Sequence, residues 1–239
     1  MRNVIDEIKE LELLFSSNDY DGIGKYPFEI IPGNNSVIIS APHAINQYRD
    51  GQVKWADMFT GGIAKYIHKI TGCHVIYSCK YDEHDPNYDL PGSNPYQDTL
   101  ADYVKSNDIV FLIDLHGAAK KREYALEMGT APEQNPIEGV IYETDPSLHE
   151  YKYVAEWIKE IFENMFINSS FEQKEVWKNR IFDAGDQNTV TKFISENTNT
   201  ACVQLEVNGH YRNPENETEF LMLVNGLVEL VNRLKNIIN

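Results

Sequence analysis

The fold is constrained most strongly by two kinds of segment that alternate along the chain. Short apolar runs rich in β-branched residues are typical of buried strands, and longer segments with apolar residues three and four positions apart are typical of helices. Residues 108–114 form the clearest strand pattern, an apolar run that ends in a polar cluster. Residues 54–70 form one apolar helical face, and Gly72 is expected to end that helix.

The remaining segments extend this alternation. Strands are predicted over 36–41, 74–78, 124–130 and 200–208, and helices over 94–104, 147–166, 189–196 and 215–238. This order predicts an α/β fold with three layers, α/β/α, around a central sheet that is mostly parallel or mixed. Because no linker, repeat or low-complexity tract divides the chain, residues 1–239 are expected to form a single α/β domain.

The charge of the chain excludes several classes of partner. There are 37 acidic against 21 basic residues, which gives a formal net charge of −16. A surface this acidic repels phosphate backbones and anionic lipid, so neither nucleic acid nor a membrane is expected as a partner. The N-terminus lacks the features of a signal peptide, and no apolar run is long enough to cross a bilayer. With its three cysteines the chain fits a reducing cytoplasm, and a homo-oligomer is compatible with the sequence.

Polar residues stand at the carboxyl ends of three predicted strands, where ligand sites form in open α/β sheets. His43 and His116 follow two of these strands, and Glu206 lies near the end of the third. A neutral imidazole is a good zinc ligand, and a catalytic zinc site typically has three protein ligands and one open position. His43 and His116 are therefore predicted to bind Zn²⁺, with Asp57 as the first choice for the third ligand.

Two acidic residues are predicted to support this site. Asp114 lies two residues before His116 on the same side of the strand, so it is placed to orient that imidazole. Glu206 lies in an apolar strand, where burying an unpaired carboxylate costs several kcal/mol, and it is predicted to accept and deliver the proton in a hydrolysis. Each of these residues also has a purely structural explanation. The histidines can be hydrogen-bonded without a metal, and Asp57 can be an acid that the helix dipole favours in the first turn of a helix. Glu206 can form a salt bridge to a lysine or an arginine.

A third group of residues is predicted to contact the substrate. Asn87 lies in a polar loop and is a candidate hydrogen-bond partner. Asn208, Tyr211 and Arg212 end or follow the strand that carries Glu206 and are expected at the mouth of the same crevice. Arg212 is a candidate for binding a substrate carboxylate, because the guanidinium fork matches that anion, with a surface arginine as the alternative.

Five short motifs occur along the chain in a characteristic order. They are Ile39-Ser-Ala-Pro-His43, Trp55-Ala-Asp57, Asp85-Pro-Asn87, Asp114-Leu-His116-Gly117 and Gln204-Leu-Glu-Val-Asn208. In this order the sequence resembles the N-formylglutamate amidohydrolase family, which is related in fold and site layout to zinc carboxypeptidases. The resemblance spans roughly residues 34–234. It implies a zinc-carboxypeptidase-like fold with zinc held by His43, Asp57 and His116, Glu206 as general base and Asn87 in contact with substrate.

The sequence departs from the family pattern at two positions. Tyr88 stands where the family motif Asp-x-Asn-Arg has an arginine that is expected to bind a substrate carboxylate or polarise the scissile carbonyl, and Tyr88 is therefore included among the substrate-binding candidates. Asn46 stands where carboxypeptidases have a glutamate ligand. The first departure puts N-formylglutamate itself in question as the substrate. After the second, either Asp57 is the third metal ligand or the metal site is weaker than in the family.

Together these residues predict a zinc-dependent amidohydrolase that cleaves the amide of an N-acyl amino acid, similar to N-formylglutamate, or of a small peptide. The alternative is a catalytically degenerate domain of the same fold that binds a small molecule, which the departures at Tyr88 and Asn46 favour. A hydrolase with a nucleophilic serine or cysteine is disfavoured, because no Gly-x-Ser-x-Gly turn occurs and Cys202 lies inside a predicted strand.

Overall fold

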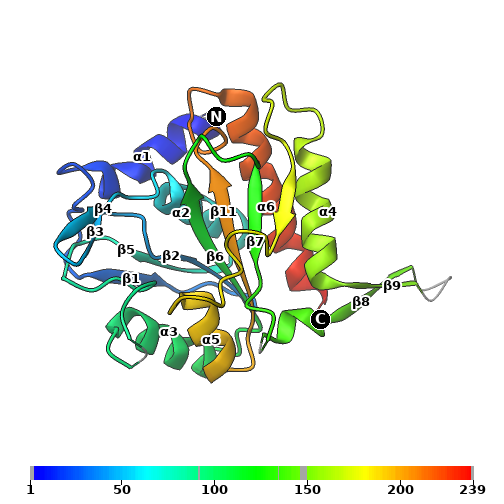
Figure 1. The fold of residues 1–239 in the computed structure, drawn as a ribbon, viewed down its shortest axis with the longest axis horizontal. Helices are drawn as coiled ribbons and strands as arrows, with labels where there is room; N and C mark the ends of the chain where they lie inside the picture. The colour runs from blue at the N-terminus through cyan, green and yellow to red at the C-terminus, as the bar shows by residue number, and fades with distance from the viewer. Residues whose placement is uncertain (1–2, 91, 134, 146–149, 238–239) are drawn as a thin grey trace.

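A central sheet of seven strands forms the middle layer of the computed structural model, which describes residues 3–90, 92–133, 135–145 and 150–237. The strand order is β1-β5-β2-β6-β11-β7-β10 (Figure 1). Their bounds are Phe28–Ile31 (β1), His74–Ser78 (β5), Val37–Ala41 (β2), Phe111–Ala118 (β6), Ala201–Asn208 (β11), Leu126–Gly129 (β7) and Val176–Lys178 (β10). Strands β5, β2, β6 and β11 are parallel, whereas β1 pairs antiparallel with β5 and β7 antiparallel with β11. The sheet is therefore mixed.

Helices cover both faces of this sheet (Figure 1). One face packs against α1 (Val4–Ser16), α2 (Thr60–Thr71), α4 (Val154–Phe166) and α6 (Glu217–Ile237). The opposite face packs against α3 (Pro95–Ser106) and α5 (Val190–Asn197). The predicted α/β/α fold class is confirmed. The smaller elements are the hairpins β3–β4 (Gln47–Arg49, Gln52–Lys54) and β8–β9 (Ile141–Asp145, Glu150–Tyr153) and the 3₁₀ turn η1 (Pro136–Glu138).

The central strands are buried on both faces, as their continuous apolar runs indicate. In β2, Ile39 faces the larger helix layer and Ile38 faces α3 and α5. In β6, Ile113 faces the larger helix layer and Leu112 faces α3 and α5. This alternation matters for function because Asp114 and His116 follow Leu112 at intervals of two and so lie on the α3–α5 face. The three cysteines are buried and free, and no helix in the described ranges combines the length and apolar character that a bilayer span requires.

Two predicted helices begin later than expected. The first starts at Thr60 rather than at residue 54, because Asp50 and Gly51, both with positive φ, close the β3–β4 hairpin that takes up Lys54. The second starts at Val154. Residues 150–153 before it form β9, and residues 146–149 lie outside the described ranges. Gly72 ends α2 in the left-handed conformation, as predicted.

Glu12 of α1 fixes the start of α2. Its Oε1 accepts hydrogen bonds from the backbone N–H of Phe59 at 2.7 Å and from the Tyr20 hydroxyl at 3.0 Å, and its Oε2 accepts one from the N–H of Gly62 at 2.8 Å. The carboxylate thus satisfies N–H groups that the first turn of a helix leaves free. Burial raises the pKa of Glu12 to about 7 in spite of these bonds. The loop just before α2, which carries Asp57, is therefore held at its helical end by α1.

We expect Glu12 to make the stability of the fold depend on pH. A carboxyl group whose pKa is raised on folding, here from 4.5 to about 7, stabilises the folded state most below pH 4.5, and this contribution is lost as the pH rises through 7. A shift of this size corresponds to about 3 kcal/mol of unfolding free energy. Urea unfolding at about pH 5 and about pH 8 should show a smaller pH-dependent loss in Glu12→Gln than in the wild type. The exposed carboxylate variant Glu172→Gln is the control, and equal losses in all three proteins would contradict the role of Glu12.

Candidate metal centre

The three predicted metal ligands, together with Asn87 and Glu206, meet in one cavity of about 220 Å³ at the carboxyl ends of the parallel strands. The strand register explains this convergence, because Glu206 in β11 lies beside His116 in β6, and Gln204 lies beside Asp114. His43 follows the end of β2, the strand on the other side of β6. The lining residues are His43, Arg49, Lys54, Asp57, Asn87, His116, Gly117, Ala118, Ala119, Arg122, Phe182, Gln187, Thr189, Gln204 and Glu206.

Three buried side chains in this cavity have the arrangement of a metal site. One ligand atom from each of His43, Asp57 and His116 lies within 4.8 Å of the other two, and no other group of this kind occurs among the described residues. The Nδ1 atoms of His43 and His116 lie 3.5 Å and 3.2 Å from Asp57 Oδ2. In tetrahedral zinc sites with bonds of about 2.0–2.2 Å, ligand atoms stand roughly 3.3 Å apart. The donor set and its spacing therefore fit a divalent cation.

The outer nitrogen of each imidazole contacts a carboxylate. His43 Nε2 lies 2.9 Å from Asp85 Oδ1, and His116 Nε2 lies 3.2 Å from Asp114 Oδ2. For His43, the carboxylate at Nε2 favours the tautomer with its proton on that nitrogen and leaves the lone pair on Nδ1. His43 Nδ1 is buried and makes no hydrogen bond. Both imidazoles are thus oriented with Nδ1 toward the same point, as metal-binding histidines are.

The electrostatics of this group favour a positive charge at its centre. Burial lowers the pKa of His116, but the carboxylates of Asp114 and Asp57 outweigh burial and raise that pKa to about 10. Burial also raises the pKa of Asp57, whereas Lys54 and both imidazoles hold it well below its usual range. Asp57 is accordingly a carboxylate, as a metal ligand must be.

Asp57 is held from three directions. Lys54 Nζ donates to Asp57 Oδ1 at 2.7 Å, which leaves Oδ2 facing the imidazoles. The backbone N–H of Asp57 donates to the carbonyl of His43 at 2.8 Å. Asn46 Oδ1 accepts the N–H of Ala56 at 2.9 Å. Asn46, at the position of the carboxypeptidase glutamate, therefore holds the segment that carries Asp57. Asp57 precedes α2 by three residues rather than lying in its first turn.

Asp85 is an essential part of this geometry that is not among the predicted metal-site residues. Its buried carboxylate contacts His43 and accepts hydrogen bonds from Arg49 Nε and, at 2.9 Å, from the backbone N–H of Asn87. Burial raises the pKa of Asp85, but His43 and Arg49 hold it well below its usual range. The sequence signal is the motif Asp85-Pro-Asn87, in which the first residue supports the metal site and the third lines the cavity.

Glu206 and Asn87 lie beside the candidate metal site. Glu206 Oε1 accepts a hydrogen bond from Gln204 Nε2 at 2.8 Å, and no ion pair joins Glu206 to a cation in the described part of the chain. Asn87 Nδ2 lies 2.9 Å from His116 Nε2, and Asn87 Oδ1 accepts the N–H of Val190 at the start of α5. Both side chains line the cavity, as a proton carrier and a substrate contact must.

Four of the predicted substrate-binding residues do not line the cavity, and the side chain of each forms hydrogen bonds within the chain itself. Arg212 is buried and donates to the backbone carbonyls of Val207, Ala118 and Met58. Tyr211 is fully buried in the larger core, and its hydroxyl donates to the carbonyl of Gln173. The reason is that buried donors require partners, and the nearest acceptors here are backbone carbonyls.

Asn208 and Tyr88 complete this group. Asn208 Nδ2 lies within hydrogen-bond distance of three carbonyls in the β6–β7 connection, those of Lys120, Arg122 and Tyr124. Tyr88 is exposed, and its hydroxyl donates to Asp50 Oδ2 at 2.6 Å. Asn208 thus shapes a loop that reaches the cavity, while Tyr88 contacts the β3–β4 hairpin.

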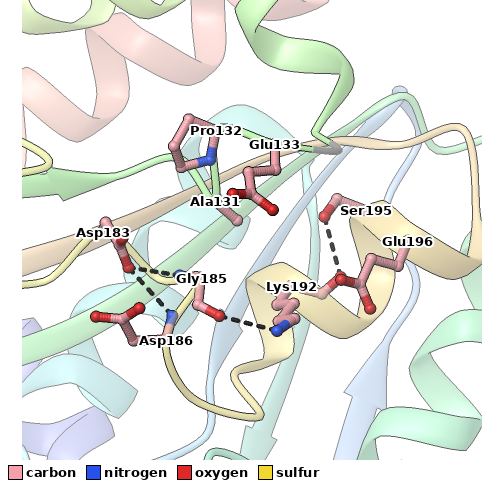
Figure 2. A pocket seen from close by; sticks show the side chains of 9 residues that line it. All are labelled: Ala131, Pro132, Glu133, Asp183, Gly185, Asp186, Lys192, Ser195 and Glu196. Atoms are coloured by element: carbon pink, nitrogen blue, oxygen red, sulfur yellow. Dashed lines mark hydrogen bonds between the residues drawn. The ribbon is translucent and has the colours of Figure 1, made fainter.

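Figure 2 shows a second cavity, of about 210 Å³, beside the loop that follows β10. Asp183 Oδ1 accepts the N–H groups of Gly185 and Asp186, and Lys192 Nζ donates to the carbonyl of Gly185. The acidic groups here are accompanied by no histidine or cysteine among the lining residues, which are Ala131, Pro132, Glu133, Asp183, Gly185, Asp186, Lys192, Ser195 and Glu196. The donor set that could hold a metal ion belongs to the first cavity.

Comparison with known proteins identifies the fold. No protein-family model matches the sequence, and a search of curated proteins also finds no match. The structure of N-formylglutamate amidohydrolase from Ralstonia eutropha JMP134 matches with a TM-score of 0.53 at 13% identity, over 88% of this chain and 97% of that chain. The structure of a bacteriophage poly-γ-glutamate hydrolase matches with a TM-score of 0.51 at 14% identity, over 90% of this chain and 92% of that chain.

A third match is the tripeptide-bound cell shape determinant Csd4 from Helicobacter pylori, with a TM-score of 0.53 at 12% identity. It covers 88% of this chain but 56% of that chain. Identities this low show a shared fold. The resemblance to N-formylglutamate amidohydrolases is therefore confirmed at the level of the fold, and this chain has the α/β fold of the solved N-formylglutamate amidohydrolase and poly-γ-glutamate hydrolase structures.

Proposed function

We propose that the protein is a zinc-dependent amidohydrolase that cleaves the amide bond of an N-acyl amino acid or of a small peptide. The observation that carries the proposal is the convergence of His43 Nδ1, His116 Nδ1 and Asp57 Oδ2 in a cavity that also contains the carboxylate of Glu206. Two imidazoles and one carboxylate with an adjacent acid form the usual donor set of a hydrolytic zinc site. The fold shared with amide-cleaving enzymes supports the same reaction class.

Different residues of the chain have different roles in the proposed hydrolysis. Zinc, when bound, polarises the scissile carbonyl and lowers the pKa of water to about 7. Glu206 would accept a proton from the water whose oxygen bonds to the carbonyl carbon and would deliver that proton to the leaving nitrogen, so that the C–N bond breaks to give a carboxylic acid and an amine. Asp85 and Asp114 hold the two imidazoles, and Lys54 and Asn46 hold Asp57, throughout.

The size and polarity of the cavity agree with a small substrate. Its volume of about 220 Å³ is below the roughly 300–1,000 Å³ of pockets that enclose drug-sized ligands. Most of its lining side chains are polar or charged. An N-acyl amino acid fits such a space better than an apolar amide.

The test is hydrolysis of a panel of N-acyl amino acids and short α- and γ-linked peptides by the zinc-loaded protein. We expect release of free amine from at least one member, abolished by removal of zinc and restored when zinc is returned. Zinc binding without turnover of any member would instead support the degenerate binding domain. Hydrolysis that persists after complete removal of metal would contradict the proposal.

Asp85→Asn should weaken metal binding without removing a ligand. The variant keeps the size of the side chain but loses the charge that orients His43, and loss of such an outer partner typically lowers metal affinity 10–100-fold. Zinc affinity measured by competition with a chelator is the readout. Asp98→Asn, an exposed substitution in α3, is the matched control and should bind zinc as the wild type does. Unchanged affinity in Asp85→Asn would contradict the role given to Asp85.

A further inference from the structure

Three cationic side chains other than the histidines line the cavity, and only one of them lacks an acidic partner. Arg49 is ion-paired with Asp85, and Lys54 with Asp57. The guanidinium of Arg122 forms no ion pair or side-chain hydrogen bond with any residue in the described ranges, and its Nε is buried without a partner. A buried donor without a partner is costly to the free protein and available to a ligand.

We propose that Arg122 binds a carboxylate group of the substrate and so restricts the enzyme to amides that carry a free carboxylate near the scissile bond. The proposal rests on the amidohydrolase function proposed above and names the substrate class for that site. The guanidinium fork matches a carboxylate with two parallel hydrogen bonds, which gives both affinity and orientation. The role predicted for Arg212 is thereby assigned to an arginine whose donors are free.

The loop that carries Arg122 is held in place before any ligand binds. Asn208 Nδ2 lies 3.1 Å from the carbonyl of Arg122 itself, with the carbonyls of Lys120 and Tyr124 at 3.3 and 2.9 Å. The N–H of Arg122 donates to the carbonyl of Ala119 at 3.0 Å. A backbone fixed in this way reduces the entropy lost when the side chain binds a ligand.

The guanidinium itself is supported by an aromatic ring. Its Cζ lies 5.0 Å from the centre of the Phe182 ring, within the range of a cation–π contact. The backbone around Phe182 is fixed by the buried Glu127, whose Oε1 accepts the N–H groups of Arg180, Ile181 and Phe182. An aromatic face leaves the hydrogen-bonding edge of the guanidinium free, which an ion pair would not.

The cavity offers an unpaired cation to an anionic substrate although the chain as a whole is strongly acidic. The net charge of the chain is −16. Of the three cations that line the cavity, Arg49 is ion-paired with Asp85 and Lys54 with Asp57. Attraction of an anion is therefore local to this cavity, and Arg122 is the cation there whose charge is not already paired.

The test is binding of matched acids and amides to the metal-free and the zinc-loaded protein. The probes are N-acetyl-L-glutamate, its two monoamides and its diamide, and the readout is affinity from calorimetry or ligand-observed NMR. We expect the wild type to bind the acid at least tenfold more tightly than the diamide, and the monoamides to show which carboxylate matters. Arg122→Gln should lose that difference, and Arg122→Lys should keep part of it. Arg180→Gln, an exposed arginine that stacks on Trp177 outside the cavity, is the control and should behave as the wild type does.

Arg122→Gln should fold normally, because its guanidinium has no ion pair or hydrogen bond to lose and only the contact with the Phe182 ring is removed, and an unchanged Tm checks this. Equal affinity of the wild type for acid and diamide, no binding of any probe, or an unaltered preference in Arg122→Gln would each overturn the proposal. Acid-selective binding that depends on Arg122, without hydrolysis of any substrate, would leave this proposal standing and remove the amidohydrolase. Hydrolysis without any preference for acids would support the amidohydrolase function and overturn the role proposed for Arg122.

Discussion

Glu206→Gln is expected to abolish nearly all hydrolysis while leaving the metal site intact. The substitution keeps the shape of the side chain but removes the carboxylate that takes up and delivers the proton. Loss of a positioned acid–base group typically lowers kcat by about 10²–10⁴-fold. Because Glu206 is not one of the three ligand residues, zinc affinity should stay at the wild-type value.

The measurement is kcat and KM on the best substrate of the panel, together with zinc content. Glu133→Gln, which removes a carboxylate from the second cavity (Figure 2), is the matched control and should keep wild-type turnover. Near wild-type turnover in Glu206→Gln would show that another group carries the proton. Loss of zinc together with activity would place Glu206 among the metal ligands instead.

Asp57→Asn is expected to lose both metal and activity. The amide has almost the same size, and Lys54 and the backbone bonds of this segment remain, so the fold should survive. The amide oxygen is a much weaker ligand than a carboxylate, and the site keeps only the two imidazoles. The fall in zinc affinity should therefore exceed the 10–100-fold expected for an outer partner such as Asp85.

Comparing Asp57→Asn with Asp85→Asn in the same chelator competition separates ligands from supporting residues. The expected order of zinc affinity is wild type, then Asp85→Asn, then Asp57→Asn. A reversed order would mean that Asp85 binds the metal and Asp57 supports it. Circular dichroism of both variants checks that the fold is retained.

The parts of the fold that are predictable from the sequence are those whose pattern is long and local. The β-branched run of β2 and the apolar run of β6 are unambiguous because both strands are buried on two faces. Gly72 ends α2 for a reason that lies in the residue itself, its tolerance of positive φ. Two other features depend on pairing between strands, which the spacing of apolar residues along the chain does not reveal. They are the late start of α4 after β9 and the hairpin before Asp57.

The candidate site likewise has some features that are predictable from the sequence and others that depend on the folded structure. His43 and His116 are predictable because strand ends of a parallel sheet converge, and Asp57 because it lies just beyond the loop that carries His43. The structure brings the three together. Arg212 and Arg122 were not separable from sequence, because an arginine bound to backbone carbonyls and an arginine facing a cavity look alike until the β6–β7 connection is folded. The contact between Asp85 and His43 joins residues 42 positions apart and depends on where the loop after β5 lies.

Anomalous diffraction from a crystal of the zinc-loaded protein would show whether His43, Asp57 and His116 hold one metal ion between them. We predict a single strong peak at the zinc absorption edge, about 2.0–2.2 Å from Nδ1 of each histidine and from a carboxylate oxygen of Asp57. A fully zinc-loaded crystal with no peak between these three residues, or with its peak at another group of ligands, would contradict the account.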